Sequence, residues 1–332
     1  MGERVTSLDV ARLAGVSRSA VSRAFTPGAS VSKGTAAKVR AAAEQLGYRP
    51  NVLARSLLTG RSRVIGLVVA YLDGHFYPGV VEKLSNAFQA EGYHVLIFMA
   101  SRDAGNLDQV AREMMDYQVD ALVLASVEMT SDITRQCRDT GVPVILFNRR
   151  QEQAGELAVV SDNQQGGRLV AAHFAALGRR RIGYIAGLDS ASTQRDREAG
   201  FVAGLEEAGL RLHARASGAF RPDQARDATV EMFGRADRPD AVFVASDAMA
   251  LAVMDTLRFE LGLNVPGDVA VAGFDDVPIA GWPSYRLTSV RQDVDGMVAD
   301  TVRLTIARVE GRPEPAPLPR PVTLSVRVST TG

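Results

Sequence analysis

The sequence holds one cysteine, one tryptophan and four histidines among 332 residues. A single thiol, Cys137, can form neither an internal disulfide nor a cysteine-rich zinc site, which excludes a disulfide scaffold. The histidines show no HExxH or paired spacing, so neither a metal nor a cofactor is expected. No run approaches ~18 consecutive apolar residues, which excludes a membrane-spanning helix. The charged N-terminal segment lacks the apolar core of a secretory leader, and a cytoplasmic location is predicted.

The usual motifs of α/β enzymes are also absent. The sequence contains no GxGxxG, GxxxxGK[ST] or GxSxG, and no Cys/His pair with nucleophilic spacing. Asp275 and Asp276 are neighbours in the chain, so their side chains need not converge for acid–base catalysis. We therefore predict that the protein is not an enzyme. An α/β enzyme stays open as an alternative that turnover on a panel of sugars would reveal.

The charges are unevenly distributed along the chain. Hydrophobic residues make up 46% and charged residues 23%, an ordinary globular composition, and the length suits about two domains. Residues 1–63 carry eleven Lys and Arg but three Asp and Glu, a net charge of +8, which leaves −8 for residues 64–332. A basic head on an acidic body is typical of a nucleic-acid-binding module joined to another domain. A solvated basic face would give the same count.

Three short helices are predicted within the basic head. Thr6 or Ser7 can cap the first helix, and its apolar residues, which recur at helical spacing, are Leu8, Val10, Ala11, Leu13 and Ala14. The turn Gly15-Val16-Ser17 leads to a second helix over 18–25, and a third runs over about 33–46 between Ser32 and Gly47. This order is that of a helix-turn-helix, although a generic αα-hairpin would look similar.

The exposed face of the second helix is basic and rich in hydroxyls. Ser17 caps this helix, Ala20, Val21 and Ala24 are expected to face inward, and the residues expected to face outward are Arg18, Ser19, Ser22 and Arg23. An α-helix fits the major groove of DNA, where Arg18 can donate two hydrogen bonds to a guanine. The serines and Arg23 can reach bases or phosphates.

A further short helix is predicted between Pro50 and Gly60. Proline suits a helix start and glycine a helix end, but two turns are too few to be stable alone in water. The segment also carries apolar residues before the first strand of the body. It is typical of a hinge that folds on binding DNA, with Leu57 as an apolar wedge for the minor groove. A linker whose leucines pack on the body fits the residues equally well.

From Val64 onward, short apolar runs alternate with amphipathic stretches. The runs, predicted as strands, are 64–69, 94–99, 121–124, 144–147, 182–186, 213–217, 241–244 and 269–272. The stretches, predicted as helices, are 77–91, 106–117, 131–140, 163–177, 195–208, 222–235 and 247–261. This alternation is typical of parallel sheets covered on both faces. Two such series predict two doubly wound α/β lobes, whose ligands bind beyond the carboxyl ends of the strands.

Polar and aromatic residues follow most of these predicted strands. They are Asp73–Tyr77, Asn148-Arg149, Ser161–Asn163, Ser192–Arg197, Phe220, Ser246-Asp247 and Asp275-Asp276. Carboxylates and amides pair with hydroxyls, arginine pairs with an anion or ring oxygen, and aromatic rings stack on apolar ring faces. We therefore expect a polar, hydroxylated ligand. Asp162 and Ser246 also fit helix capping alone.

Several segments together resemble one family. They are TSLDVARLAGVSRSAVSRAF, LGYRPNVLARSLLTGRSRVIGLVV, VSDNQQGG, TQRDREAGF, VASDAMALAVM, VAGFDD and LTSVRQD. In these segments the chain is similar to the lactose-repressor (LacI/GalR) family of bacterial transcription factors, and the resemblance extends to about residue 328. It implies an α/β fold in which a helix-turn-helix head is joined by a hinge helix to a two-lobed, periplasmic-binding-protein-like body with parallel sheets.

The resemblance also implies domain limits and site residues. The expected domains are 1–49 for the head, 50–63 for the hinge and 64–332 for the body, with lobe one about 64–161 plus 291–320 and lobe two about 162–290 plus 321–330. The implied DNA-binding residues are Ser17, Arg18, Ser19, Ser22, Arg23, Asn51, Ala54 and Leu57. The implied effector-binding residues are Phe76, Asn148, Arg197, Phe220, Asp247 and Asp275. The family usually has Asn-Pro-Phe after the first strand, whereas this chain has Gly74-His75-Phe76.

The function that the resemblance implies is sequence-specific transcriptional regulation at the nucleoid, and we predict a repressor. A homodimer would bind a palindromic operator in double-stranded DNA, since two recognition helices give useful specificity. A small polar effector, a sugar or sugar derivative, would bind between the lobes. Because no heptad tail precedes Gly332, we expect a dimer rather than a tetramer. The alternative is a solute-binding sugar receptor, against which the basic head and the missing leader argue.

Overall fold

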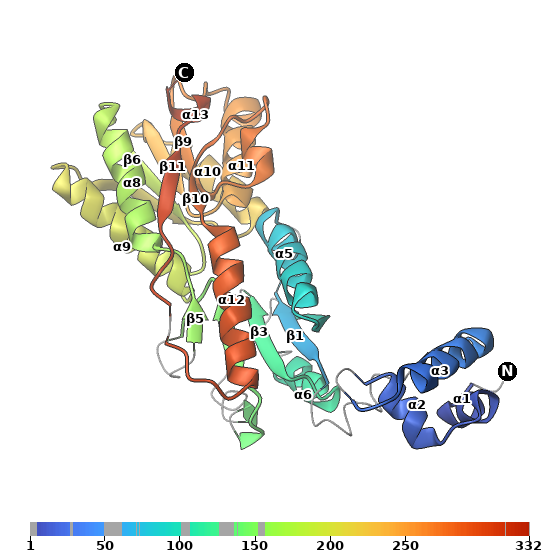
Figure 1. Ribbon diagram of the computed structural model, residues 1–332. Helices are drawn as coiled ribbons and strands as arrows, with labels where there is room; N and C mark the ends of the chain where they lie inside the picture. The colour runs from blue at the N-terminus through green and yellow to red at the C-terminus, as the bar shows by residue number, and fades with distance from the viewer. Residues whose placement is uncertain are drawn as a thin grey trace. The chain divides into compact units, whose positions relative to one another are not determined.

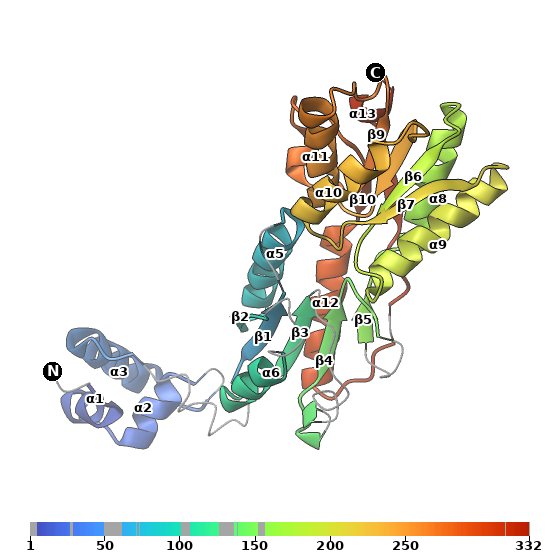
Figure 2. The ribbon, with the colours of Figure 1, turned by 180° about the vertical axis from the view of Figure 1, so that it is seen from behind.

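The computed structural model (Figures 1 and 2) describes most of the chain. The described residues are 5–26, 29–49, 62–70, 72, 74–100, 107–125, 136, 137, 139–151, 157–315 and 317–331. The chain divides into two compact units, residues 1–63 and residues 64–332. The predicted hinge helix and most of the predicted helix 131–140 lie outside the described residues.

The first unit is a three-helix head. Its helices are α1 (Ser7–Ala14), α2 (Arg18–Ala24) and α3 (Lys33–Leu46). At the start of α1 the Thr6 backbone N–H and hydroxyl both donate to the Asp9 carboxylate, at 2.9 and 2.7 Å, and these bonds lower the pKa of Asp9. Gly15 ends α1 with φ of 64°, a left-handed conformation that glycine adopts without strain. The predicted helix-turn-helix is therefore confirmed.

Small apolar residues fill the core of the head. The buried ones are Val10, Ala11, Val21, Ala24, Val39, Ala42 and Ala43. Leu8 and Leu13 fit the apolar periodicity of α1 but are 49% and 46% exposed. A helix of eight residues offers little more than one buried stripe, and Val10 and Ala11 already occupy it.

The body contains a first lobe built on a parallel sheet with strand order β2-β1-β3-β4-β5. The strands are β1 (Val64–Val69), β2 (His94–Met99), β3 (Ala121–Ala125), β4 (Val144–Phe147) and β5 (Leu157–Val159). The helices are α5 (Phe76–Ala90), α6 (Leu107–Asp116) and α12 (Val294–Val309). Ile65 and Leu67 pack on the α5 and α12 side, while Val68 packs on the opposite side with Met114 of α6. Figure 1 shows α12, from late in the chain, beside β3.

The second lobe has a sheet with strand order β11-β10-β9-β8-β6-β7. The strands are β6 (Ile182–Ala186), β7 (Leu212–Ser217), β8 (Ala241–Val244), β9 (Ala270–Asp275), β10 (Thr288–Gln292) and β11 (Val322–Ser325). The helices are α8 (Asn163–Ala176), α9 (Ser192–Glu207), α10 (Pro222–Phe233), α11 (Asp247–Asp255), the π-helical turn Thr256–Glu260, the 3₁₀ turn Pro278–Gly281 and α13 (Val328–Thr331). Among these strands, neighbours run parallel except β10 and β11. The predicted pair of α/β lobes is confirmed.

The segments that cross between the two lobes are hydrogen-bonded to one another. The Arg320 backbone N–H donates to the Val160 carbonyl at 2.8 Å, and the Asp162 N–H donates to the Arg320 carbonyl at 2.8 Å. The Ser161 hydroxyl donates to Oε1 of Gln292 at 2.7 Å. These bonds join the crossings near residues 161, 292 and 320. In the described part of the chain no helix is both long and apolar enough to span a membrane.

The short C-terminal helix α13 is held to the second sheet by a buried serine. The Ser329 hydroxyl, which is fully buried, donates to the Val271 carbonyl and accepts from the Thr288 N–H, both at 2.7 Å. Ser329→Ala leaves a buried N–H without a partner, and we expect the free energy of unfolding to fall by about 1–3 kcal/mol. Urea unfolding measures this change. Thr331→Ala, at an exposed position of the same helix, is the control; equal effects would contradict the assignment.

Candidate effector pocket and DNA-binding helix

Helix α2 presents a basic, hydroxyl-bearing face to solvent. The Ser17 hydroxyl caps the helix by accepting from the Ala20 N–H at 3.2 Å. Val21 and Ala24 are buried, which turns the opposite face outward. The exposed residues on that face are Arg18, Ser19, Ser22 and Arg23. The structure therefore leaves all four of these side chains accessible to solvent.

Two hydrogen bonds organise the start of this face. Nε of Arg18 donates to the Ser7 hydroxyl at 3.1 Å, and the Ser17 and Ser19 hydroxyls lie 2.9 Å apart. The remaining predicted DNA-binding residues, Asn51, Ala54 and Leu57, lie outside the described residues.

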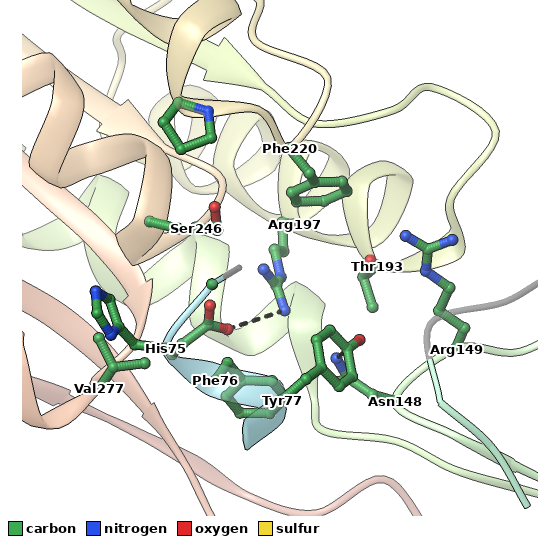
Figure 3. A pocket seen from close by; sticks show the side chains of 14 residues that line it. His75, Phe76, Tyr77, Asn148, Arg149, Thr193, Arg197, Phe220, Ser246 and Val277 are labelled. Atoms are coloured by element: carbon green, nitrogen blue, oxygen red, sulfur yellow. Dashed lines mark hydrogen bonds and ion pairs between the residues drawn. The ribbon is translucent and has the colours of Figure 1, made fainter. Parts of the chain in front are cut away.

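A pocket lies between the two lobes of the body (Figure 3). Lobe one supplies Gly74, His75, Phe76, Tyr77, Asn148 and Arg149. Lobe two supplies Thr193, Arg197, Phe220, Pro222, Ser246, Ala248, Asp275 and Val277. Most of these residues follow the carboxyl ends of β1, β4, β7, β8 and β9 or begin the next helix, as expected for parallel α/β sheets. The pocket thus brings together Phe76, Asn148, Arg197, Phe220 and Asp275, five of the six predicted effector residues.

Arg197, from α9, is the most confined charged group of the pocket. Its side chain is 2% exposed. Its Nε donates to the Asn163 amide oxygen at 2.9 Å, and its NH1 donates to the Ala245 carbonyl. Its guanidinium carbon also lies 3.6 Å from the ring centroid of Phe274. The guanidinium is therefore held in place by three groups: the side chain of Asn163 in α8, the backbone carbonyl of Ala245 after β8, and the ring of Phe274.

Asp275, at the end of β9, is the carboxylate partner of Arg197. The distance between Oδ1 of Asp275 and NH2 of Arg197 is 3.7 Å, drawn as the dashed line in Figure 3. Nε2 of Gln292 donates to the same carboxylate at 2.8 Å. Burial raises the pKa of Asp275 to about 6, against the opposing effects of Arg197 and Gln292. Its φ of 120° is uncommon for a residue with a side chain.

This raised pKa makes the stability of the body depend on pH. The ordinary pKa is 3.8, so between about pH 4 and pH 6 the folded protein holds the Asp275 proton more tightly than the unfolded chain does. The contribution of Asp275 to folding is largest below this range and falls as pH rises through it. We expect the Tm of the wild type to fall relative to that of Asp275→Asn between about pH 4 and pH 7. Parallel Tm curves would contradict the assignment.

Asp247, the sixth predicted effector residue, lies behind the pocket wall rather than on it. It is fully buried; Oδ2 accepts from the Val277 N–H at 2.9 Å and Oδ1 accepts from the Ser289 hydroxyl at 2.6 Å. Burial, together with the nearby charge of Asp275, raises the pKa of Asp247. Its neighbour Ser246 lines the pocket instead. Both oxygens of Asp247 thus hold protein groups in place.

Asn148, at the end of β4, offers a hydrogen-bond acceptor. Its Nδ2 donates to the Tyr77 hydroxyl at 3.1 Å, and its φ is 67°. Its Oδ1 is buried and has no hydrogen-bond partner among the described residues. A buried acceptor without a donor is costly, so a ligand hydroxyl that reached Oδ1 would gain a hydrogen bond at little further cost of desolvation.

Aromatic rings form apolar walls. Phe76 and Tyr77 pack edge to face with ring centroids 5.2 Å apart. Phe220 lies so close to Gly187 that a Cβ at residue 187 would be 2.2 Å from its ring, which only glycine allows. These rings suit the apolar faces of a small ring-shaped ligand.

The lobes are also joined beside the pocket by Arg150 and by residues of α9. One guanidinium nitrogen of Arg150 lies 2.8 Å from both carboxylate oxygens of Asp196. The Arg150 N–H donates to the Ser192 hydroxyl at 3.0 Å. Arg150 is not among the predicted site residues, although it follows the predicted Asn148 by two residues. For Asp162 the sequence also allowed a role as a helix cap alone. Its carboxylate caps α8 by accepting a hydrogen bond from the Gln165 N–H at 2.9 Å.

Comparisons with known proteins agree with this architecture. A model described as "Bacterial regulatory proteins, lacI family" matches residues 6–51, and one described as "Periplasmic binding protein-like domain" matches residues 171–330. The ribose operon repressor of Escherichia coli (strain K12) is 31% identical over 309 residues, covering 92% of this chain and 93% of that protein.

Two solved structures are similar over almost the whole chain. The transcriptional regulator CelR in complex with cellobiose has 31% identity and a TM-score of 0.74, covering 98% of this chain and 100% of that one. The lac repressor dimer bound to operator and the anti-inducer ONPF has 27% identity and a TM-score of 0.90, covering 99% of this chain and 100% of that one.

The fold and the site define a DNA-binding transcriptional regulator with a periplasmic-binding-protein-like body. The chain belongs to the lacI family of bacterial regulatory proteins. The predicted resemblance is confirmed, and so is the prediction that the protein is not an enzyme, because members of this family are transcriptional regulators.

Proposed function

We propose that the protein is a repressor that binds a palindromic operator as a dimer and is controlled by a sugar or sugar derivative between its lobes. The observation that carries the proposal is that one chain combines the exposed basic face of α2 with a pocket built around the buried Arg197–Asp275 pair. It would act in the cytoplasm, at the nucleoid. The sugar class is supported by the similar regulator whose structure contains cellobiose.

A dimer follows from the recognition helix and fits the surface of the body. One short helix makes few base contacts, and two helices related by twofold symmetry read two half-sites. Apolar side chains are exposed on the body: Ile97 and Met99 by 43% and 46% on the edge strand β2, and Phe259 and Trp282 by 80% and 57% in lobe two. A partner subunit could cover these exposed apolar side chains. The similar lac repressor structure is a dimer bound to operator.

The segment between head and body is proposed as the hinge. Within it, Asn51 and Ala54 would contact the DNA, and Leu57 would insert into the minor groove at the centre of the operator. Bending the central step would then add to specificity.

Effector control requires that the effector bind two states of the body with different affinity. Closure of the lobes around a ligand would change the DNA affinity of the head, typically by about 1–3 kcal/mol of coupling.

Two measurements test the proposal. A thermal-shift screen of sugars identifies ligands of the folded state, because such ligands raise Tm. Selection from random duplexes at several salt concentrations identifies an operator, and the absence of any preferred duplex would refute the proposal.

Arg18→Ala tests the recognition helix. We expect a loss of about 1–3 kcal/mol on the selected operator and relaxed specificity at one base pair, because Arg18 would donate two hydrogen bonds to a guanine. Fluorescence anisotropy on the operator and on single-base variants measures both effects. Equal weakening on all sequences would make Arg18 a phosphate contact. Arg12→Ala, an exposed arginine of α1 near Asp9, is the control.

A further inference from the structure

The cavity between the lobes is small. Its volume is about 50 Å³. A buried water needs roughly 10–15 Å³ on the same measure, so the cavity has room for about four waters. One sugar ring displaces on the order of five waters, and two linked rings displace about twice as many. A single ring therefore needs only a slight widening of this cavity, whereas two rings need far more space than it provides.

Phe220 forms a wall that has little freedom to withdraw. Its ring packs directly on the backbone of Gly187, where a Cβ would lie 2.2 Å from the nearest ring atom. The guanidinium carbon of Arg149, a residue that is 7% exposed, lies 6.0 Å from the ring centroid. Phe220 is thus in contact with a backbone segment of its own lobe and lies close to a side chain of lobe one. The cavity cannot easily be extended past this ring.

Contacts across the lobes close the pocket further. We call the bonds that Arg150 makes with α9 the interlobe clasp: its guanidinium binds Asp196 at 2.8 Å, and its backbone N–H donates to the Ser192 hydroxyl at 3.0 Å. The lobes also approach each other at Gly74, because a Cβ there would lie 3.9 Å from Cβ of Ala248, an ordinary contact distance. A ligand longer than the cavity would have to hold the lobes farther apart and break the clasp.

We propose that the effector is a single sugar ring rather than two or more linked rings. This inference rests on the proposed function, because it names the size class of the same effector. A ring hydroxyl donates to the buried Oδ1 of Asn148. The ring packs between Phe76 of lobe one and Phe220 of lobe two, which Figure 3 shows on opposite sides of Arg197. A second ring would have to displace Phe220 or open the interlobe clasp.

The clasp sets the expected size of the discrimination. The side chains of Arg150 and Asp196 are 48% and 20% exposed, and an ion pair at such a rim contributes little by itself. The bond to Ser192 is worth more, because Ser192 is buried and its hydroxyl would lose a partner. Losing both bonds, together with contacts of the pocket walls, should weaken binding of a two-ring sugar by about tenfold or more.

Matched pairs of sugars test this inference on the full chain. The pairs are D-glucose with cellobiose, D-galactose with galactobiose, D-mannose with mannobiose and D-xylose with xylobiose. Thermal shifts identify the pair that binds, and calorimetry gives its two Kd values. We expect the single ring to bind at least about tenfold more tightly than its two-ring partner. A two-ring sugar that binds as tightly or more tightly would overturn the inference and leave the proposed function intact. No response to any of these sugars would count against both.

Substitutions in the clasp assign the discrimination to a contact. Arg150→Ala removes the bond to Asp196, and Ser192→Ala removes the acceptor of the Arg150 N–H. In each variant the ratio of the two-ring Kd to the single-ring Kd should fall about threefold or more, because the lobes can settle farther apart at lower cost. Arg235→Ala removes an arginine–carboxylate pair with Glu231 within lobe two and should keep the wild-type ratio. A wild-type ratio in both clasp variants would refute the assignment.

Discussion

Replacing Arg197 by alanine is expected to abolish the effector response while operator binding persists. The guanidinium contacts Asn163, the Ala245 carbonyl and Asp275, and it lies 3.6 Å from the ring of Phe274. All of these contacts are lost together in the alanine variant. The pocket then loses its buried guanidinium as a donor for a ligand oxygen, and the carboxylate of Asp275 has lost its cation.

The same substitution should destabilise the body. Removing one partner of a buried ion pair typically costs about 3–5 kcal/mol, because the other charge is left uncompensated. For a chain of this size the Tm should fall by roughly 10 °C. A double variant, Arg197→Met with Asp275→Asn, removes both charges and should recover part of the lost Tm while still failing to respond to effector.

Differential scanning fluorimetry and operator titrations with and without effector separate these effects. Arg195→Ala is the control, because Arg195 lies two residues away on the exposed side of α9 and its NH1 donates to the Ser190 carbonyl. A normal effector dose response in Arg197→Ala would remove Arg197 from the site. Loss of response in the single variant but recovery in the double variant would show that the single variant fails through the stranded charge alone.

The sequence predicted strands correctly where their buried residues are apolar. In the runs 64–69 and 241–244 every residue except the partly buried Val64 is buried, and their composition alone identifies them as strands. Strand β10 (TSVRQ) was missed because most of its buried residues, Thr288, Ser289 and Gln292, are polar. Thr288 and Ser289 are fully buried, and their hydroxyls donate to the Arg327 carbonyl and to Asp247. Such partners are distant in the chain and leave no local apolar pattern.

Contacts between residues distant in the chain also decide which of the predicted effector residues line the pocket. Placing polar residues at the carboxyl ends of strands located the pocket, because parallel α/β topology brings those ends together. It did not distinguish Ser246 from Asp247, since adjacent residues at a helix start point in different directions. Asp247 turns toward Val277 and Ser289, and only the packing of β9 and β10 against α11 determines that orientation.

We expect Gly200→Ala to lower both Tm and effector affinity, because Gly200 lies where α8 and α9 approach each other closely. A Cβ on Gly200 would lie 2.0 Å from the Gln164 carbonyl oxygen, and a Cβ on Gly167, in the facing helix, would lie 2.3 Å from the Arg197 carbonyl oxygen. The two backbones are therefore in direct contact, which only glycine permits at these positions. An added methyl group must push the helices apart by more than about 1 Å to reach an ordinary contact distance of 3.4 Å.

The displacement acts on both stability and binding. Overpacking of a core typically costs about 1–3 kcal/mol, and here the obstacle is backbone that cannot rotate away, so we expect about 3 kcal/mol or more. The better helix propensity of alanine offsets less than about 1 kcal/mol of this cost. Because Arg197 lies one turn before Gly200 on α9, its guanidinium should shift relative to Asn163 and Asp275, and effector affinity should fall with Tm.

Gly79→Ala provides the matched control. Gly79 also lies within a helix, α5, but a Cβ there meets no other atom within 4 Å. Its replacement should leave Tm unchanged or raise it slightly, since alanine loses less backbone entropy on folding. Scanning calorimetry on the two variants isolates the effect of the contact from that of glycine itself. If Gly200→Ala had the same Tm as Gly79→Ala, then α8 and α9 would not be in backbone contact. The inference that this contact positions Arg197 in the pocket would then be wrong.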